Sequence, residues 1–369
     1  MAEPMSATLE PMSATLIAGG CPVSDVIPPH MMDRLSKFVA RIRARVREVQ
    51  DAQSVNYEIA GLPVRFRFLD PRIKEQVTPA FQHLRTAMNI QPEFTVLLEG
   101  ASSPLANLPQ WLEWDGWGER DIWVVKVAEM MLIIQNKAQA IVALDYLSMT
   151  GYWCELRPIG MTYLARAAPL RRLLAHWFGS RGRYLFHGAA VGESEGGVLI
   201  LGAGGSGKST TALACLEEGM AYAGDDRCLL SMDGSPHVYS LYGTAKLMDI
   251  DQFPSFASAV DVDGKTCDEK AMYLLHRLSD NTLHCGFPLR AILLAQIEDI
   301  RETRISPASH ARGFLALAAS GALHFPEMRK QALHCFNSVA RGLPVYDLRL
   351  GANIRSTPDA IRKLLWELG

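Results

Sequence analysis

The sequence predicts an α/β protein in which a mixed sheet flanked by helices follows a smaller, β-rich α+β domain. Three observations predict this fold: the length of 369 residues, a run of short strand patterns over residues 55–160, and a glycine-rich loop between a strand pattern and a helix pattern further on. At ~150 residues per domain, the chain has room for two domains. We expect a disordered tail over residues 1–32, an N-terminal helix and β-rich domain over 33–164, and the α/β domain over 165–369.

The composition is that of a globular protein without a large electrostatic field. Thirty-seven Lys and Arg against 39 Asp and Glu leave a net charge of −2, so no global charge attracts nucleic acid or an acidic membrane. The seven cysteines form no CxxC pair, which is typical of reduced thiols rather than disulfides or a zinc site. No apolar run reaches the ~18 residues of a membrane span, and no Lys or Arg of a secretory signal precedes Arg34. We expect a cytoplasmic protein with no nucleic-acid or membrane partner.

The first fifty residues contain a short repeat and a basic helix pattern. The segment from Glu3 to Leu9 recurs from Glu10 to Leu16, but two copies are too few for a solenoid, so we assign the repeat to the tail. Apolar residues at helical spacing over 33–50 predict an amphipathic helix with Arg and Lys on its other faces. Such a basic face is usually solvated, although it could also rest on an acidic partner or a membrane surface.

Strand patterns dominate the next hundred residues. Alternating apolar and basic residues at 64–68 predict a half-buried strand, and apolar runs at 94–98 and 121–127 predict two more. Residues 70–88 are expected to form a helix. Four tryptophans over residues 111–123 could provide an aromatic substrate platform, but rings packed beneath a loop are the more common arrangement.

A phosphate-binding loop is the strongest functional signal. The strand pattern at 198–201 runs into GAGGSGKS, which fits GxxxxGK[ST] between a strand and a helix. Glycines let backbone N–H groups turn toward phosphate oxygens, and the dipole of the following helix favours the same anion. Lys208 would reach the β- and γ-phosphates of ATP, and Ser209 would ligate Mg²⁺. The predicted nucleotide-binding residues are Gly202, Ala203, Gly204, Gly205, Ser206, Gly207, Lys208, Ser209 and Thr210.

Two acidic residues follow the next strand pattern. The helix predicted after Lys208 stops at Gly219, and the strand that returns beside the loop delivers Asp225 and Asp226 to the phosphate end of the sheet. Adjacent residues at a strand end point in opposite directions. One carboxylate could therefore be a general base and the other could hold Mg²⁺. His187 lies in a strand pattern over 184–191 that can pair with 197–201; on its own, such a histidine is more often a packed core residue.

These pieces resemble the HPr kinase/phosphorylase family. The resemblance is carried by His187-Gly-Ala-Ala-Val191, the phosphate loop, Thr210-Thr-Ala-Leu213, Gly219 and Gly224-Asp225-Asp226-Arg227, in that order. The segment is most similar to the HPr-kinase-like serine kinases of bacterial biosynthetic gene clusters, including those that phosphorylate lasso-peptide precursors. The resemblance implies a P-loop HPr kinase/PEP carboxykinase-like mixed sheet.

The resemblance also implies residue roles. Lys208 would bind the β/γ-phosphates, Asp225 would take the proton from the acceptor hydroxyl, and Asp226 would support the metal with Ser209 or orient Asp225. His187 would sit near the transferred phosphoryl group. HPr kinases carry a further Glu-containing segment that completes their Mg²⁺ site and that this chain lacks. The additional candidate contacts are Asp249, which lies near that position, and Lys246, Arg290 and Arg304.

The sequence therefore predicts a phosphotransferase that uses ATP and Mg²⁺. We expect a kinase that transfers the γ-phosphoryl group to a Ser or Thr hydroxyl of a small protein or precursor peptide. One alternative is a kinase for a small molecule, such as free serine or a sugar. The other is a non-catalytic ATP-binding sensor or assembly factor. A homo-oligomer is compatible with either function.

Overall fold

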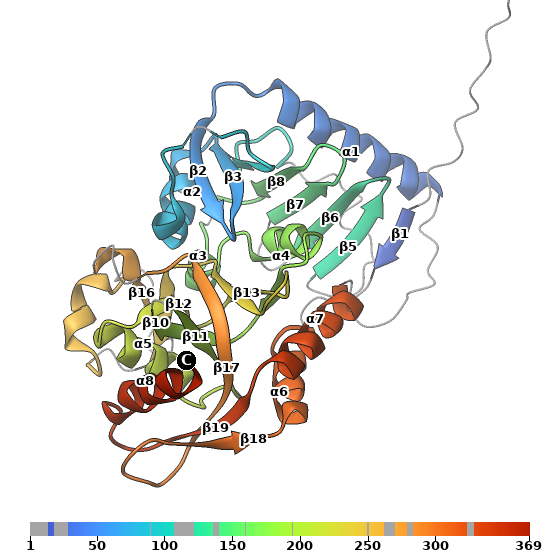
Figure 1. The fold of residues 1–369 in the computed structure, drawn as a ribbon. Coiled ribbons are helices and arrows are strands. Elements are labelled where there is room, and N and C mark those ends of the chain that lie inside the picture. Colours follow the sequence, from blue (N-terminus) through green and yellow to red (C-terminus); the bar gives the residue numbers. More distant parts are fainter. Residues whose placement is uncertain are drawn as a thin grey trace, which may run out of the picture.

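Two mixed sheets with helices on their faces make up the fold (Figure 1). The structure is a computed structural model that describes residues 14–17, 29–88, 90–106, 122–135, 140–158, 160–193, 195–248, 251–261, 270–278, 283–322 and 328–369. The arrangement is mixed α/β, as the sequence predicts. None of the helices described for this chain combines the length and apolarity needed to span a bilayer.

The first sheet has the strand order β1-β5-β6-β7-β8-β4-β3-β2. Strand β4 is parallel to both β3 and β8, and the other neighbours are antiparallel. The strands predicted at 64–68, 94–98 and 121–127 are confirmed as parts of β3, β4 and β5. The strand bounds are β1 (Ala14–Ile17), β2 (Gln53–Ile59), β3 (Leu62–Phe68), β4 (Phe94–Glu99), β5 (Ile122–Val127), β6 (Met130–Gln135), β7 (Ala140–Asp145) and β8 (Thr150–Glu155).

The two faces of this sheet are covered differently. Helix α1 (Pro29–Glu48) lies across one face and buries the apolar stripe that predicted it, including Leu35, Phe38 and Ile42. The other face packs on α2 (Pro71–Val77), a 3₁₀ helix (Thr78–Leu84) and α4 (Arg171–Gly179). The same core includes Leu229 and Tyr242 from the second half of the chain. One continuous apolar core therefore joins the two sheets.

Two predictions for this region differ from the structure. The helix expected over 70–88 is an α-helix only from Pro71 to Val77, because Pro79 lacks the N–H that would continue it and the chain tightens into a 3₁₀ helix. The tail expected over 1–32 contains strand β1 and the start of α1. The rest of the tail, most of its repeat, and the side chains of Trp111, Trp114, Trp117 and Trp123 lie outside the described residues.

The second sheet has the order β12-β10-β11-β17-β14-β13-β9, and β19 pairs with β17 and β18. Strands β11, β17 and β19 are mutually parallel neighbours, with β17 in the middle. Strands β17 and β19 include the apolar-rich runs at 289–296 and 345–350 of the sequence. The bounds are β9 (Tyr184–Phe186), β10 (Ala189–Glu193), β11 (Gly196–Leu201), β12 (Ala221–Gly224), β13 (Cys228–Ser231), β14 (His237–Ser240), β17 (Gly286–Ile297), β18 (Arg304–Ala308) and β19 (Val345–Leu350); a separate pair is β15 (Thr244–Leu247) and β16 (Ala271–Leu274).

Helices cover both faces of the second sheet. Helices α5 (Lys208–Glu217) and α8 (Ser356–Leu368) share one core, and α6 (His310–Leu317) and α7 (Arg329–Gly342) pack into another. Thr357 is of a residue type that often caps helices, but α8 already includes Ser356, and the Thr357 hydroxyl bonds that of Thr303 at 2.7 Å instead. The remaining short elements are α3 (Tyr163–Ala167), 3₁₀ helices at Pro254–Ala259 and Leu275–Arg277, and a π-helical turn at Ala318–Ala322.

Candidate active site at the phosphate-loop edge

Three strands bring the predicted site residues to one edge of the second sheet. Strand β10 is antiparallel to both β11 and β12, with Ala189 opposite Ile200 and Ala190 opposite Gly224. Strands β11 and β12 therefore end, and β10 begins, at the same edge. The returning strand was expected directly beside the loop strand; β12 is instead separated from β11 by β10. The loop and the acidic pair still reach the same edge.

His187 lies at the break between β9 and β10, which pair with different strands. The strand pattern over 184–191 is split into β9, which pairs with β13, and β10, which pairs with β11 and β12. The Nδ1 atom of His187 is 2.7 Å from Oδ1 of Asp226 and 2.9 Å from the backbone oxygen of the same residue. A side chain at Gly188 would lie 2.8 Å from the Phe186 ring, so this break in the strand needs glycine. The break turns His187 toward the acidic pair.

The phosphate loop has the backbone that its glycines predict. Gly205 and Gly207 have φ values of 79° and 92°, the left-handed region that favours glycine. Helix α5 begins at Lys208, so the N–H groups of its first turn have no acceptor within the helix and favour an anion. The Lys208 ammonium donates to the carbonyls of Gly202 and Ala203, both at 2.9 Å. Burial lowers the pKa of Lys208, and Lys270 adds to this effect.

Asp226 is held by basic side chains on several sides. Its Oδ2 is 2.6 Å from the Lys246 ammonium, its Oδ1 contacts His187, and the Arg227 guanidinium lies 4.0 Å away. Burial opposes ionisation of this carboxyl. The hydrogen bond from His187 and the charges of Lys246 and Arg227 outweigh that effect and hold the pKa of Asp226 well below its usual range. Asp226 is therefore an ionised anchor for three neighbours.

Asp225 has the opposite surroundings. Its side chain is 1% exposed, and neither carboxylate oxygen has a hydrogen-bond partner in the described structure. Burial, followed by the charge of Asp226, raises its pKa to about 6, while Ser209 and Lys246 act in the other direction. The buried Tyr222 hydroxyl lies beside this carboxylate and likewise has no hydrogen-bond partner within 3.5 Å in the described structure. An ionised carboxylate is costly in such a place, so this geometry fits a cation or the hydroxyl of a ligand.

The same edge meets the requirements of Mg²⁺ bound together with phosphate. Among the described residues, no three His, Cys, Asp or Glu side chains form a metal-binding cluster. Proteins usually hold Mg²⁺ through one or two side-chain oxygens, with phosphate and water oxygens completing the octahedron. Ser209 in the first turn of α5 and the orphaned carboxylate of Asp225 fit such a site. Each oxygen of Asp226 already contacts one basic side chain, so a metal at Asp226 would share an oxygen with His187 or Lys246.

Of the additional candidate contacts that the structure describes, one lies at the site and two lie elsewhere. Lys246 reaches the site through Asp226. Arg290 does not, because it donates to the Glu195 carbonyl at the start of β11, the end opposite the loop. Arg304 begins β18, which β19 and β17 separate from β11, and Asp249 lies outside the described residues. Sequence reasoning missed Tyr222 and Lys270; an aromatic residue in a buried strand and a lone lysine carry no distinguishing pattern.

Comparisons with known proteins add little to this geometry. No protein-family model matches the chain, and no curated protein matches it. Among solved structures, the HPr(Ser) kinase/phosphatase from Coxiella burnetii is similar, with 10% identity and a TM-score of 0.30, over 50% of this chain and 97% of that chain. A TM-score of this size supports no conclusion about activity.

Proposed function

We propose that the chain is a kinase that transfers the γ-phosphoryl group of ATP to a Ser or Thr hydroxyl of a protein or peptide, with Mg²⁺. One observation carries the proposal. Four of the five buried acidic side chains in the described structure bond to an arginine: Glu99, Asp145, Glu155 and Asp261. Asp225 bonds no arginine, neither of its oxygens has a hydrogen-bond partner within 3.5 Å in the described structure, and it lies at the sheet edge that carries the phosphate loop.

The residues of the loop would hold the nucleotide. Bound Mg·ATP would supply the phosphoryl group and the positive charge that offsets its oxygens. The left-handed glycines and the first turn of α5 present N–H groups to an anion, and Lys208 adds a positive charge. Two of the three Lys208 donors bond loop carbonyls, which leaves one for a phosphate oxygen. The Ser209 hydroxyl would ligate the metal.

Asp225 would accept the proton of the acceptor hydroxyl. Its raised pKa of about 6 makes it a stronger base than an ordinary aspartate, yet one that is mostly ionised at neutral pH. Asp226 would act as a positioning residue, because it fixes His187 and Lys246 beside the base. Phosphoryl transfer has a loose transition state, so such positioning and charge compensation provide most of the rate.

The test is transfer of label from γ-labelled ATP to an array of Ser- and Thr-containing peptides, with each acceptor replaced by Ala in a matched array. We expect hydroxyl-dependent labelling that Lys208→Ala reduces by roughly 100-fold or more, since it removes a charge from the phosphates. Lys330→Ala, which changes an exposed lysine on α7, is the control. Labelled free serine or sugar would replace the peptide acceptor by a small molecule. ATP binding without any phosphorylated product would overturn the kinase proposal in favour of a sensor.

A further inference from the structure

Helix α1 presents a basic strip on the face that points away from the first sheet. Its apolar stripe is buried against the sheet, so the opposite face is the one available to a partner. We define the basic strip by five residues at helical spacing on that face, all exposed except the half-buried Ala44: Lys37, Ala40, Arg41, Ala44 and Arg47. Three long cationic side chains thus surround two alanines, which leave room for another chain to approach the helix closely.

The charge of this strip is only partly offset. Lys37 has one exposed contact, to Asp33 at 2.6 Å, and Arg41 donates to a backbone carbonyl. In the described structure, Arg47 has no bonded acidic neighbour. Glu48 follows at the end of the helix and offsets one positive charge. The strip therefore keeps a net positive charge that favours an acidic partner.

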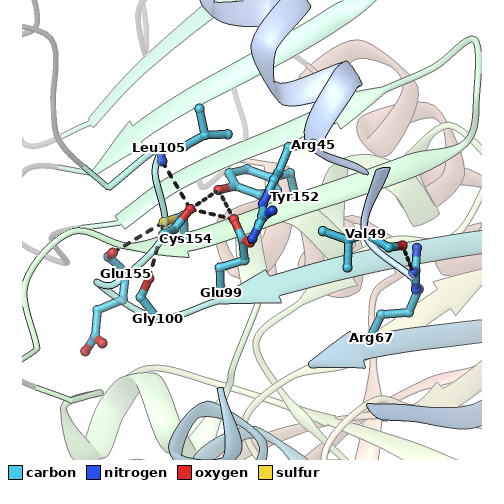
Figure 2. A network of polar contacts seen from close by, with 10 residues as sticks. Arg45, Val49, Arg67, Glu99, Gly100, Leu105, Tyr152, Cys154 and Glu155 are labelled. Carbon is cyan, nitrogen blue, oxygen red and sulfur yellow. Dashed lines mark hydrogen bonds and ion pairs between the residues drawn. The ribbon is translucent and has the colours of Figure 1, made fainter. Parts of the chain in front are cut away.

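The helix that carries this strip is firmly attached. Arg45 reaches from α1 to the buried Glu99, whose other oxygen accepts hydrogen bonds from Ser103 and Tyr152, both at 2.6 Å (Figure 2). Arg67 donates to a backbone carbonyl just beyond the helix end. These inward contacts attach α1 to the sheet. The strip is therefore a rigid, preorganised surface, which lowers the entropic cost of binding.

A hollow of about 330 Å³ lies beside the C-terminal half of the strip, between α1 and strands β6, β7 and β8. The small side chain of Ala143 and its cross-strand partner Tyr152 line this hollow on the face toward α1. Its size is at the lower end of the ~300–1,000 Å³ typical of ligand sites. The lining includes Ile42, Val46, Met130, Ala143, Leu147 and Tyr152, and Arg47 borders both the hollow and the strip.

The size of the combined surface indicates its occupant. The strip extends over 10 residue steps of α1, from Lys37 to Arg47, or ~15 Å at the helical rise. An extended peptide covers that length with about five residues, whereas a small molecule does not. An interfacial membrane helix needs an exposed apolar face, and the apolar face of α1 is buried. A positive strip with an adjacent apolar hollow is complementary to an acidic peptide that carries one large apolar side chain.

We infer that this surface is a docking site for an acidic peptide segment that inserts one apolar side chain into the hollow. The segment runs along the basic strip over the two alanines and pairs its carboxylates with Arg41 and Arg47. That the segment belongs to the phosphoryl acceptor rests on the proposed function; the binding itself does not. The surface lies on the far side of the first sheet from the core shared with the second sheet. The docking surface and the phosphate-loop site are therefore separate places on the molecule.

The experiment measures binding by fluorescence anisotropy, without nucleotide. The probe is a fluorescein-labelled six-residue peptide with one leucine among acidic residues. We expect saturable binding that weakens with added salt and that falls roughly tenfold when serine replaces the leucine, since the apolar burial is lost. The double variant Arg41→Glu/Arg47→Glu should weaken binding by roughly tenfold or more. Ser148→Trp, at the rim of the hollow, should lower affinity for the leucine peptide but not for the serine peptide.

Matched controls separate this surface from general basicity and from the kinase proposal. Lys330→Glu/Arg341→Glu reverses two exposed charges on α7 and should leave binding unchanged. Lys208→Ala should also bind the peptide normally, so failure of phosphoryl transfer would not affect this result. Equal affinity for the leucine and serine peptides, or an unchanged affinity in the Arg41/Arg47 variant, would overturn the inference. Binding of phosphatidylserine vesicles that is stronger than binding of either peptide would also overturn the inference, because it would identify the strip as a membrane contact.

Discussion

Two buried carboxylates, one in each sheet, have opposite surroundings. Glu99 at the end of β4 is 2% exposed and bonds Arg45, Ser103 and Tyr152. Asp225, just beyond β12, is 1% exposed and has no hydrogen-bond partner in the described structure. A paired buried acid is satisfied by the fold alone, whereas an unpaired ionised one imposes a cost that a proton or a ligand can offset. The difference separates an acid that builds the structure from one that is available for chemistry.

Asp226 occupies an intermediate position in this comparison. It is paired, like Glu99, but its partners His187 and Lys246 come from the same edge as the phosphate loop. Its ionised charge also raises the pKa of Asp225. One acid of the pair is thus used to hold the site together and, through its charge, to make the other a stronger base.

The largest change in stability is expected when Glu99 is replaced. Glu99→Ala leaves the Arg45 charge and two buried hydroxyls without their acceptor, and we expect a loss of about 3–5 kcal/mol in the free energy of unfolding. Urea denaturation measures it. The control is Glu93→Ala, which breaks the exposed Arg181–Glu93 pair and should cost under ~1 kcal/mol. An equal loss of unfolding free energy in Glu99→Ala and Glu93→Ala would contradict a structural role for Glu99.

Replacement of Asp225 should have a smaller effect, and it should stabilise the protein. Because the folded pKa of Asp225 is raised to about 6, its protonated form is favoured in the folded state, and the wild type loses stability as the pH rises through that value. Asp225→Asn avoids this loss. Without nucleotide or Mg²⁺, the variant should be more stable than the wild type by up to about 3 kcal/mol at pH 8, and equally stable near pH 4. A variant that is less stable at pH 8 would show that Asp225 is satisfied within the fold.

Local patterns predicted the parts of this molecule that local physics determines. The phosphate loop, α5 and the end of that helix at Gly219 follow from glycine geometry and periodicity, and most strands follow from alternation. Pro79 ends the α-helix that begins after Asp70 through a local effect, the missing N–H, which the apolar pattern over 70–88 does not show. Thr357 has the right residue type for a cap, but its hydroxyl bonds Thr303 instead, a contact between distant segments.

The environment of the acidic pair could not be predicted in the same way. Spacing placed Asp225 and Asp226 near the loop, but their difference depends on which strands pair. Strand β12 pairs with β10, β9 separates from β10 at His187, and Lys246 arrives from β15. Each of these is a long-range pairing that sequence periodicity does not specify. The lack of a partner for Asp225 is a property of the assembled fold.

The most direct test of the central claim compares phosphoryl transfer and nucleotide affinity in Asp225→Asn. Loss of a general base costs roughly 10²–10⁴ in rate, whereas the loop and Lys208 that bind the phosphates are unchanged. We predict a fall of that size in transfer from labelled ATP, with nucleotide affinity within about threefold of the wild type. Asp359→Asn, at an exposed position of α8, should change neither quantity. Full transfer activity in Asp225→Asn would contradict the account.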